Sequence, residues 1–399
     1  MRIISRNIWV LSLISLCTDL ASEMLYPVLP LYLQYAGYTA LFIGILEGVA
    51  EATAGLSKSY FGQLSDISGH RLPFVRLGYS FSAISKPMLA VLAHPLWIFL
   101  SRTLDRLGKG IRTGARDALL SDESEKRNKG TVFGFHRALD SFGAVLGPAI
   151  ALWYLYHHPN DYQTLFLLAF LPGLLSVFLT FFIREKPKKS KSRRHRKSLF
   201  AFAHYWKRAP RNFKKLCIGL LLFSLFNSSD AFLLLRMKEN GLDNYEVIGV
   251  YIFYNLVYSV FSYPLGRLAD KLGLKRVMLG GILLYSLVYS GFALGNGVVF
   301  YLLLFLLYGI YAASTESIAK AWISNLVSEE DTATAIGTYS GFQSLSALIA
   351  SSLCGILWIS AGAKTTFLIT AIMSLVTFLY LLLMTSNNEA QEFNIESEP

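Results

Sequence analysis

A dense group of charged residues lies inside an otherwise apolar stretch of the sequence. Its cations are spaced three or four residues apart, so they would share one broad face of a helix. The group consists of Arg102, Asp105, Arg106, Lys109, Arg112, Arg116 and Asp117. Side chains of these types can bind oxyanions, balance buried acids or exchange protons. Asp105 precedes Lys109 by four residues, which predicts an ion pair within the helix.

Other titratable residues occur in separate apolar stretches and could meet this group. Equal helical rise from one membrane surface places Asp19 level with residues 108–112 and Glu23 level with residues 104–109. Carboxylates would then face cations, which lowers the cost of burying both. The further candidates for substrate or proton coupling are Glu47, Glu51, His136, Asp140, Asp230 and Glu316. Taken singly, each of these could instead be a structural ion-pair partner.

The composition indicates what kind of element must position these charges. The chain is 53% hydrophobic and 16% charged, and its mean hydropathy is +0.44, values typical of a membrane protein. A charged residue near the centre of a lone membrane helix costs about 2.5–3.5 kcal/mol, so the charged face must meet water or partners. Twelve apolar runs are each long enough to cross a bilayer as a helix. They are residues 7–33, 40–60, 74–93, 96–120, 131–156, 163–183, 214–237, 245–265, 275–295, 298–325, 333–360 and 363–385.

The net charge of +11 is confined to one connector. Residues 184–215 hold fourteen of the 37 basic residues and one of the 26 acidic ones. An excess of this kind beside membrane segments marks a cytoplasmic loop and a contact for lipid headgroups, rather than a site for nucleic acid. We expect both termini on the same side. The predicted layout is a six-helix bundle over 1–183, the basic connector 184–213, a second six-helix bundle over 214–385 and an acidic cytoplasmic tail over 386–399.

Two classes of feature are not found in the sequence. The first apolar run carries Asp19 and Glu23 and lacks a cleavage pattern, so we do not interpret it as a signal peptide. Cys17, Cys217 and Cys354 fall in separate runs without metal or disulfide spacing. We therefore expect no metal and no cofactor.

A short pattern occurs twice at a fixed offset and indicates a duplicated half. The first copy contains Gly62, Asp66, Gly69 and Arg71, and the second contains Gly266, Asp270, Gly273 and Lys275. Their first glycines are 204 residues apart, about half of the 399-residue chain. Parallel repeats of about six spans are one of the recurring designs of secondary transporters.

These motifs resemble those of the major facilitator superfamily, in particular its branch of twelve-span drug:proton antiporters. The loop pattern from Gly62 to Arg71 is similar to the family's best-known motif. The fifth-span antiporter motif is matched by Gly134, Gly143, Gly147 and Pro148. The sequence departs from the branch at Ala21, Ile67, Asp105 and Ala151. The resemblance implies an all-α fold of twelve transmembrane helices in two pseudo-symmetric bundles. It also implies that Asp66 and Arg71 close the cytoplasmic face with Asp117 and the start of the eleventh span.

The expected function is alternating-access transport of a small organic solute. The resemblance favours proton-coupled efflux by a monomer in the inner membrane of a prokaryote, with the solute, protons and membrane lipids as partners and no nucleic acid. One alternative is proton-coupled uptake of an organic anion bound by Arg102, Arg106, Lys109 and Arg112. A membrane-embedded enzyme is a remote alternative, because no H-E-x-x-H, G-x-S-x-G or phosphate-loop pattern occurs. The remaining alternative is a sensor that binds a ligand without transporting it.

Overall fold

The computed structural model describes residues 4–26, 28–29, 32–33, 40–185, 201–242 and 244–384, and these residues contain helices and no strand. The helices of the amino-terminal half are α1 (Arg6–Leu25), α3 (Ala40–Ser68), α4 (Leu72–Val91), α5 (Pro95–Asp122), η1 (Lys126–Asn128), α6 (Lys129–His157), α7 (Tyr162–Leu179) and η2 (Thr180–Phe182). Those that follow are α8 (Ala201–Arg208), α9 (Arg211–Ser224), α10 (Ala231–Glu239), α11 (Asn244–Leu272), α12 (Leu274–Leu294), α13 (Val298–Ala313), α14 (Glu316–Asn325), η3 (Glu329–Asp331) and α15 (Thr332–Leu383).

These helices are consistent with twelve membrane-crossing segments, but two predicted spans are broken. The segment 214–237 divides into α9 and α10 around Asn227, Ser228 and Asp230. The segment 298–325 divides into α13 and α14 at Ser314 and Thr315. Short polar side chains of this kind compete for backbone hydrogen bonds. The hydroxyls of Ser314 and Thr315 each donate to the carbonyl oxygen of Tyr311, at 2.9 and 3.0 Å.

Gly362 separates the last two spans within α15. Its φ of 81° and ψ of 162° lie outside the helical region, in a range that glycine adopts readily. This position coincides with the predicted boundary between residues 360 and 363. Among the described residues, six stretches are long and apolar enough by themselves to cross a membrane. The other long helices carry more polar sequences, and α5 holds the whole charged group.

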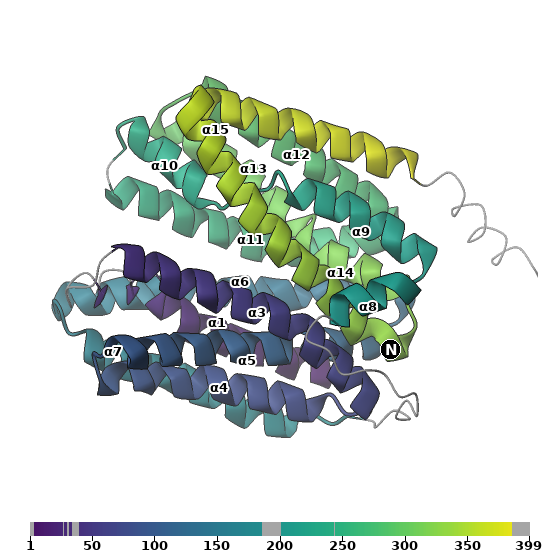
Figure 1. Cartoon of the computed structure of the whole chain (residues 1–399), viewed down its shortest axis with the longest axis horizontal. Coiled ribbons are helices and arrows are strands. Elements are labelled where there is room, and N and C mark those ends of the chain that lie inside the picture. Colours follow the sequence, from purple (N-terminus) through teal and green to yellow (C-terminus); the bar gives the residue numbers. More distant parts are fainter. Residues whose placement is uncertain are drawn as a thin grey trace, which may run out of the picture.

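The helices form two bundles, one from each half of the chain (Figure 1). The purple and blue helices α1 to α7 make one bundle, and the teal, green and yellow helices α9 to α15 make the other. Where the bundles meet, α3 packs on α15 and α6 packs on α11. Because α3 and α11 carry the two copies of the repeated motif, the contact of α3 with α15 and that of α11 with α6 are equivalent, and the interface is itself pseudo-symmetric.

Glycines allow this close contact at the end of the molecule that carries the repeated motifs. A Cβ atom at Gly62 of α3 would lie 2.6 Å from the carbonyl oxygen of Ala333 in α15. A Cβ atom at Gly130 of α6 would lie 2.7 Å from the carbonyl oxygen of Gly266 in α11. Both distances are below any normal contact, so larger residues would push the bundles apart. We call this end, which also carries Arg71, the basic end.

The distribution of side chains is that of a membrane protein. Arg112 and Asp117 are only 4% and 0% exposed, whereas Ile359 and Leu383 are 90% and 79% exposed. Charged groups inside and aliphatic groups outside suit a surrounding lipid phase. The charged side chains therefore form ion pairs and hydrogen bonds with one another inside the bundles.

Candidate functional site

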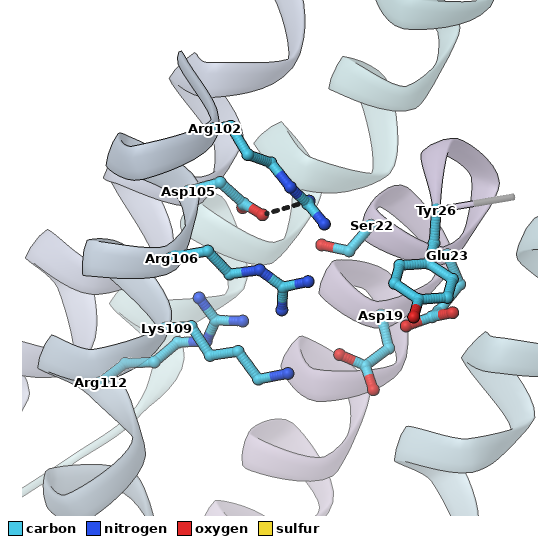
Figure 2. A pocket seen from close by; sticks show the side chains of 9 residues that line it. All are labelled: Asp19, Ser22, Glu23, Tyr26, Arg102, Asp105, Arg106, Lys109 and Arg112. Atoms are coloured by element: carbon cyan, nitrogen blue, oxygen red, sulfur yellow. Dashed lines mark ion pairs between the residues drawn. The ribbon is translucent and has the colours of Figure 1, made fainter. Parts of the chain in front are cut away.

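A small open pocket lies between α1 and α5. Figure 2 shows side chains from these two helices pointing toward each other across it. The lining residues are Asp19, Ser22, Glu23, Tyr26, Arg102, Asp105, Arg106, Lys109 and Arg112. The pocket thus brings together five of the seven residues of the charged group of α5 and the two carboxylates of α1, as equal helical rise predicts.

Three of the basic side chains in this region are held by protein partners. Asp105 forms ion pairs with Lys86 of α4 at 2.7 Å and with Arg102 at 3.5 Å. The predicted pair between Asp105 and Lys109 is therefore wrong, because Lys86 reaches the carboxylate from a neighbouring helix. Arg112 donates to Ser82 Oγ at 2.5 Å. Its guanidinium also lies 4.7 Å from the centre of the Tyr79 ring.

Two further charged residues of the pocket have different surroundings. Arg106 pairs with Glu51 of α3 at 3.1 Å, and the Glu51 side chain is 59% exposed. Lys109 is exposed and forms no ion pair with any residue that the structure describes. Its ammonium group points toward Asp19 (Figure 2). The side chain of the candidate Glu47 lies outside the described residues.

A second cluster links the two bundles through Arg137 of α6. Its guanidinium contacts Asp140 at 2.6 Å in the same helix and Glu316 at 2.7 Å in α14 of the other bundle. Tyr258 of α11 accepts a hydrogen bond from Arg137 Nε at 2.5 Å and donates one to Glu316 at 2.7 Å. Asp140 also accepts from Ser15 of α1 and lies in side-chain contact with Asp19. The pocket and the bundle interface are therefore adjacent.

Two sets of residues spaced four apart along one helix are not bonded to each other in this cluster. His136 does not bond Asp140: neither of its ring nitrogens has a hydrogen-bond partner within the described structure. The charged guanidinium of Arg137 engages Asp140 in its place. Glu316 likewise does not pair with Lys320 four residues later, since the two side chains reach different partners across the interface.

A third cluster joins the bundles closer to the basic end. Lys320 of α14 pairs with Asp117 of α5 at 2.7 Å, and the Asp117 side chain is completely buried. Arg116 pairs with the other carboxylate oxygen of Asp117 at 2.8 Å and donates to Ser15 at 3.3 Å. Asp117 thus links one cation of its own helix with one from the opposite half.

The first loop motif caps a helix of the opposite bundle. Asp66 accepts hydrogen bonds from the backbone amide and the hydroxyl of Thr334, each at 2.6 Å, at the start of α15. Arg71 pairs with Asp66 at 2.6 Å and Asp122 at 2.9 Å, and it donates to the carbonyl oxygen of Glu329 at 3.0 Å. Burial opposes charge on Arg71, but the two carboxylates raise its pKa above the usual value.

The carboxylate that meets Arg71 differs from the one that the family resemblance implies. Asp122 takes the place of Asp117. Asp117 lies five residues earlier in α5 and is therefore about 7.5 Å farther from the basic end along the helix. The implied contact with the start of the eleventh span is present through Thr334.

The second loop motif repeats the capping contact. Asp270 accepts from the backbone amides of Gly130 at 2.8 Å and Thr131 at 2.6 Å, at the start of α6. Gly69 and Gly273, the turn glycines of the two copies, have φ angles of 70° and 96°, which favour glycine. Helix amino termini attract carboxylates, so each half closes on the other by the same interaction.

The fifth-span glycines serve two different contacts. Gly134 faces α11, whereas Gly143 and Gly147 face α1. A Cβ atom at Gly147 would lie 2.7 Å from the carbonyl oxygen of Leu20, so small residues bring α1 and α6 together. Pro148 lies within α6 and has no amide hydrogen to donate.

The carboxy-terminal bundle contributes a mainly aromatic polar cluster. Asp230, beside the break between α9 and α10, accepts a hydrogen bond from Tyr308 at 2.6 Å. Asn227 donates to Tyr311 at 2.9 Å. Asp230 is thus separate from the pocket residues. Within the described residues, no group of three or more His, Cys, Asp or Glu side chains could hold a metal ion.

Sequence reasoning did not select several residues that join these clusters. Lys86, Ser15 and Tyr258 were not among the predicted site residues, and Arg137 was not singled out from its neighbours. A lone lysine in an apolar run is a detectable signal for Lys86. No local pattern distinguishes Ser15 or Tyr258 from ordinary packing residues.

Two pseudo-equivalent helix bundles, with a charged pocket inside one of them, are typical of a membrane transport protein. The family model described as Major Facilitator Superfamily matches residues 11–253 and 216–398. An uncharacterized MFS-type transporter of Methanocaldococcus jannaschii is 34% identical over 387 residues, which cover 96% of this chain and 95% of that protein. The chain therefore belongs to the major facilitator superfamily. It is an integral membrane transporter and not an enzyme.

Matches at lower sequence identity support narrower conclusions about this chain. The quinolone resistance protein NorA of Staphylococcus aureus is 26% identical over 167 residues, 42% of each chain. The structure of the human organic anion transporter MFSD10 superimposes with a TM-score of 0.80 at 17% identity, covering 94% of this chain and 99% of that one. The Escherichia coli fucose:proton symporter FucP gives a TM-score of 0.77 at 13% identity and covers 97% and 100%. These two structures share the fold.

Proposed function

We propose that this protein exports a small organic solute in exchange for protons by alternating access. The observation that carries the proposal is the direct connection between the pocket and the bundle interface. Asp19 lines the pocket and contacts Asp140, which pairs with Arg137, and Arg137 also binds Glu316 of the other bundle. A change of charge in the pocket can thereby act on an ion pair that joins the two halves.

The carboxyl groups supply a chemical basis for proton coupling. Two adjacent carboxylates repel each other, whereas a carboxyl pair that shares one proton does not. The contact between Asp19 and Asp140 can therefore bind a proton in one state and release it in another. Glu23 and Glu51 are further acids that face the same region. The transporter would use such a proton to bias one conformation over the other.

The arrangement of contacts suggests which conformation the structure represents. The Asp66 and Asp270 caps hold the bundles together at the basic end. The positive-inside rule assigns this end to the cytoplasm. In the proposed cycle the structure is therefore the state that faces outward, and release of both caps would open the inward path. Residues 1–183 and 214–385 would move as units in the prokaryotic inner membrane, with both termini inside.

The direction of export has two sources of support. Gly134, Gly143, Gly147 and Pro148 match a pattern of antiporters, and they occupy the helix that contacts both α1 and α11. The similarity to a protein named for quinolone resistance agrees with efflux of an organic solute. Both observations favour antiport over symport.

Uptake of an organic anion is the second candidate. It is favoured by the four basic side chains that line the pocket, among which Lys109 is exposed. Guanidinium and ammonium groups bind carboxylates and phosphates readily. In this case the pocket carboxylates would carry the protons that accompany the anion.

The direction in which protons move relative to the solute distinguishes antiport from symport. The full-length protein would be reconstituted in liposomes that enclose a pH-sensitive dye, without an imposed voltage. External addition of a quinolone should raise the internal pH if the solute enters as protons leave. Addition of an aromatic carboxylate should lower it if solute and protons enter together. A quinolone that lowers the internal pH contradicts antiport, and movement of both solutes without any pH change contradicts proton coupling.

A further inference from the structure

The two walls of the pocket carry opposite charges that do not meet. Asp19 and Glu23 project from α1, and Lys109 projects toward them from α5 (Figure 2). The ion pair between Arg102 and Asp105 is the one drawn among the nine lining residues. Within the described structure, neither Asp19 nor Glu23 lies within 4 Å of a basic nitrogen. Open space therefore separates the carboxylates from the ammonium group.

The other charges around the pocket are already balanced or fixed by the protein. Asp105 is paired with both Lys86 and Arg102, which leaves one positive charge in excess. Arg106 is paired with Glu51, and Arg112 is held by Ser82 and the Tyr79 ring. Charges that remain available to a ligand are thus concentrated on Lys109 at one wall and on Asp19 and Glu23 at the other.

A ligand with a single charge fits this arrangement poorly. An organic anion near Lys109 would also face the two carboxylates of α1, and an organic cation near Asp19 would face Lys109. A ligand with both charges can satisfy both walls at once, because each of its ends forms an ion pair with the opposite group. Specificity would then come from rejection of molecules that leave one wall unpaired.

We propose that the pocket binds a zwitterionic organic solute, with its ammonium group at Asp19 and Glu23 and its oxyanion at Lys109. This inference rests on the proposed transport function and names the substrate class of the same site. The pocket opens to solvent, so apolar parts of the solute can extend out of it. Tyr26 is 50% exposed and lies at the pocket, where its ring can contact an apolar part of the solute.

A set of matched ligands tests the charge requirement. The dipeptide phenylalanyl-phenylalanine is zwitterionic at neutral pH, its methyl ester is a cation, its N-acetyl form is an anion, and the doubly capped form is neutral. Binding to the purified full-length protein would be measured by calorimetry and by thermal unfolding. The free dipeptide should bind most tightly, and each cap should weaken binding at least about tenfold. The inference is wrong if either singly capped form binds as tightly as the free dipeptide, or if no form binds.

Two variants test which wall of the pocket binds the carboxylate of the ligand and which binds its amine. Lys109→Gln should abolish the preference for a free carboxylate, so that the free dipeptide and its methyl ester bind alike, while the preference for a free amine remains. Asp19→Asn should abolish the preference for a free amine and retain that for the carboxylate. Retention of one preference in each variant shows that the pocket is folded. Arg127→Gln, which changes an 81% exposed cation at the basic end, should leave all four affinities unchanged.

The inference and the proposed function can fail separately. If a quinolone drives proton movement in liposomes but the dipeptide series shows no preference for the zwitterion, transport stands and the assigned substrate class falls. If the free dipeptide binds selectively but is neither transported nor coupled to protons, the zwitterion site stands and the proposed function falls.

Discussion

Removal of one charge between the bundles should shift the protein toward the state that is open at the basic end. The substitution is Glu316→Gln. Glu316 accepts from Arg137 of the opposite bundle and from Tyr258, both at 2.7 Å. Glutamine has nearly the same shape and can still accept from both donors, so the main change is the loss of the attraction to the guanidinium.

The expected size of the effect of Glu316→Gln follows from the solvent exposure of the two paired side chains. The Arg137 and Glu316 side chains are 32% and 48% exposed, so water screens much of their attraction. Measured values for such exposed pairs reach about 1 kcal/mol. A loss of about 1 kcal/mol corresponds to about a fivefold change in the ratio of the two conformations. Arg137 keeps its contact with Asp140, which limits the effect on folding.

Distances between spin labels would report the conformational ratio. Val91 and Val299 lie at the end opposite the basic end, in different bundles, and they are 72% and 73% exposed. Labels at these positions should approach each other when the basic end opens. The native cysteines Cys17, Cys217 and Cys354 are buried and would first be replaced by alanine. The fraction of the short distance should rise about fivefold in Glu316→Gln when the starting fraction is small.

Two comparisons make the result decisive. Glu125→Gln removes a carboxylate from the exposed pair with Arg127, within one loop of a single bundle, and it should not change the distances. Arg137→Gln combined with Glu316→Gln should shift the ratio little more than Arg137→Gln alone, because both changes remove one shared contact. An unchanged distribution in Glu316→Gln, or a shift toward the longer distance, would refute the role of this pair.

Three further changes have defined outcomes. Asp66→Asn and Asp270→Asn should each weaken closure of the basic end by about 1 kcal/mol, seen in the same distance measurement, and the two effects should add because the sites are separate. Gly62→Leu should favour the open basic end more strongly than either, since a Cβ there meets the facing backbone at 2.6 Å, and labelling of that end by a thiol reagent would report it. Tyr308→Phe leaves the half-buried Asp230 without its 2.6 Å donor and should destabilise the protein by about 1 kcal/mol, whereas Asp230→Asn keeps an acceptor and should lower the unfolding temperature less.

The membrane segments could be predicted from the sequence because their signal is local. Each apolar run specifies a helix by length and composition, and the repeated glycine and aspartate pattern specifies the pseudo-symmetry. The boundary at Gly362 also coincides with the predicted link between residues 360 and 363. The helix breaks near Asp230 and at Ser314 had a local signal in their clusters of short polar residues, but the apolar residues around them favoured continuous spans.

The ion-pair partners could not be predicted in the same way. A spacing of four residues favours pairs along one helix, but an isolated helix pair competes with partners from other helices. Asp105 meets Lys86, and Glu316 meets Arg137, because the packed bundles bring these groups within 2.7 Å. Depth along the helices was the more informative guide. It placed Asp19 and Glu23 opposite α5, and they line the same pocket.

The two kinds of contact at the bundle interface suit different tasks in the proposed cycle. The caps formed by Asp66 and Asp270 bind backbone amides, which carry no charge that a proton or a solute could alter. The contact of Arg137 with Glu316 lies next to Asp140 and therefore next to Asp19. If a proton or a solute ammonium group neutralises Asp19, the repulsion between Asp19 and Asp140 is removed, and the balance of negative charge around Arg137 changes. Events in the pocket would thereby act on the ionic contact between Arg137 and Glu316, whereas the caps would remain a separate barrier to opening.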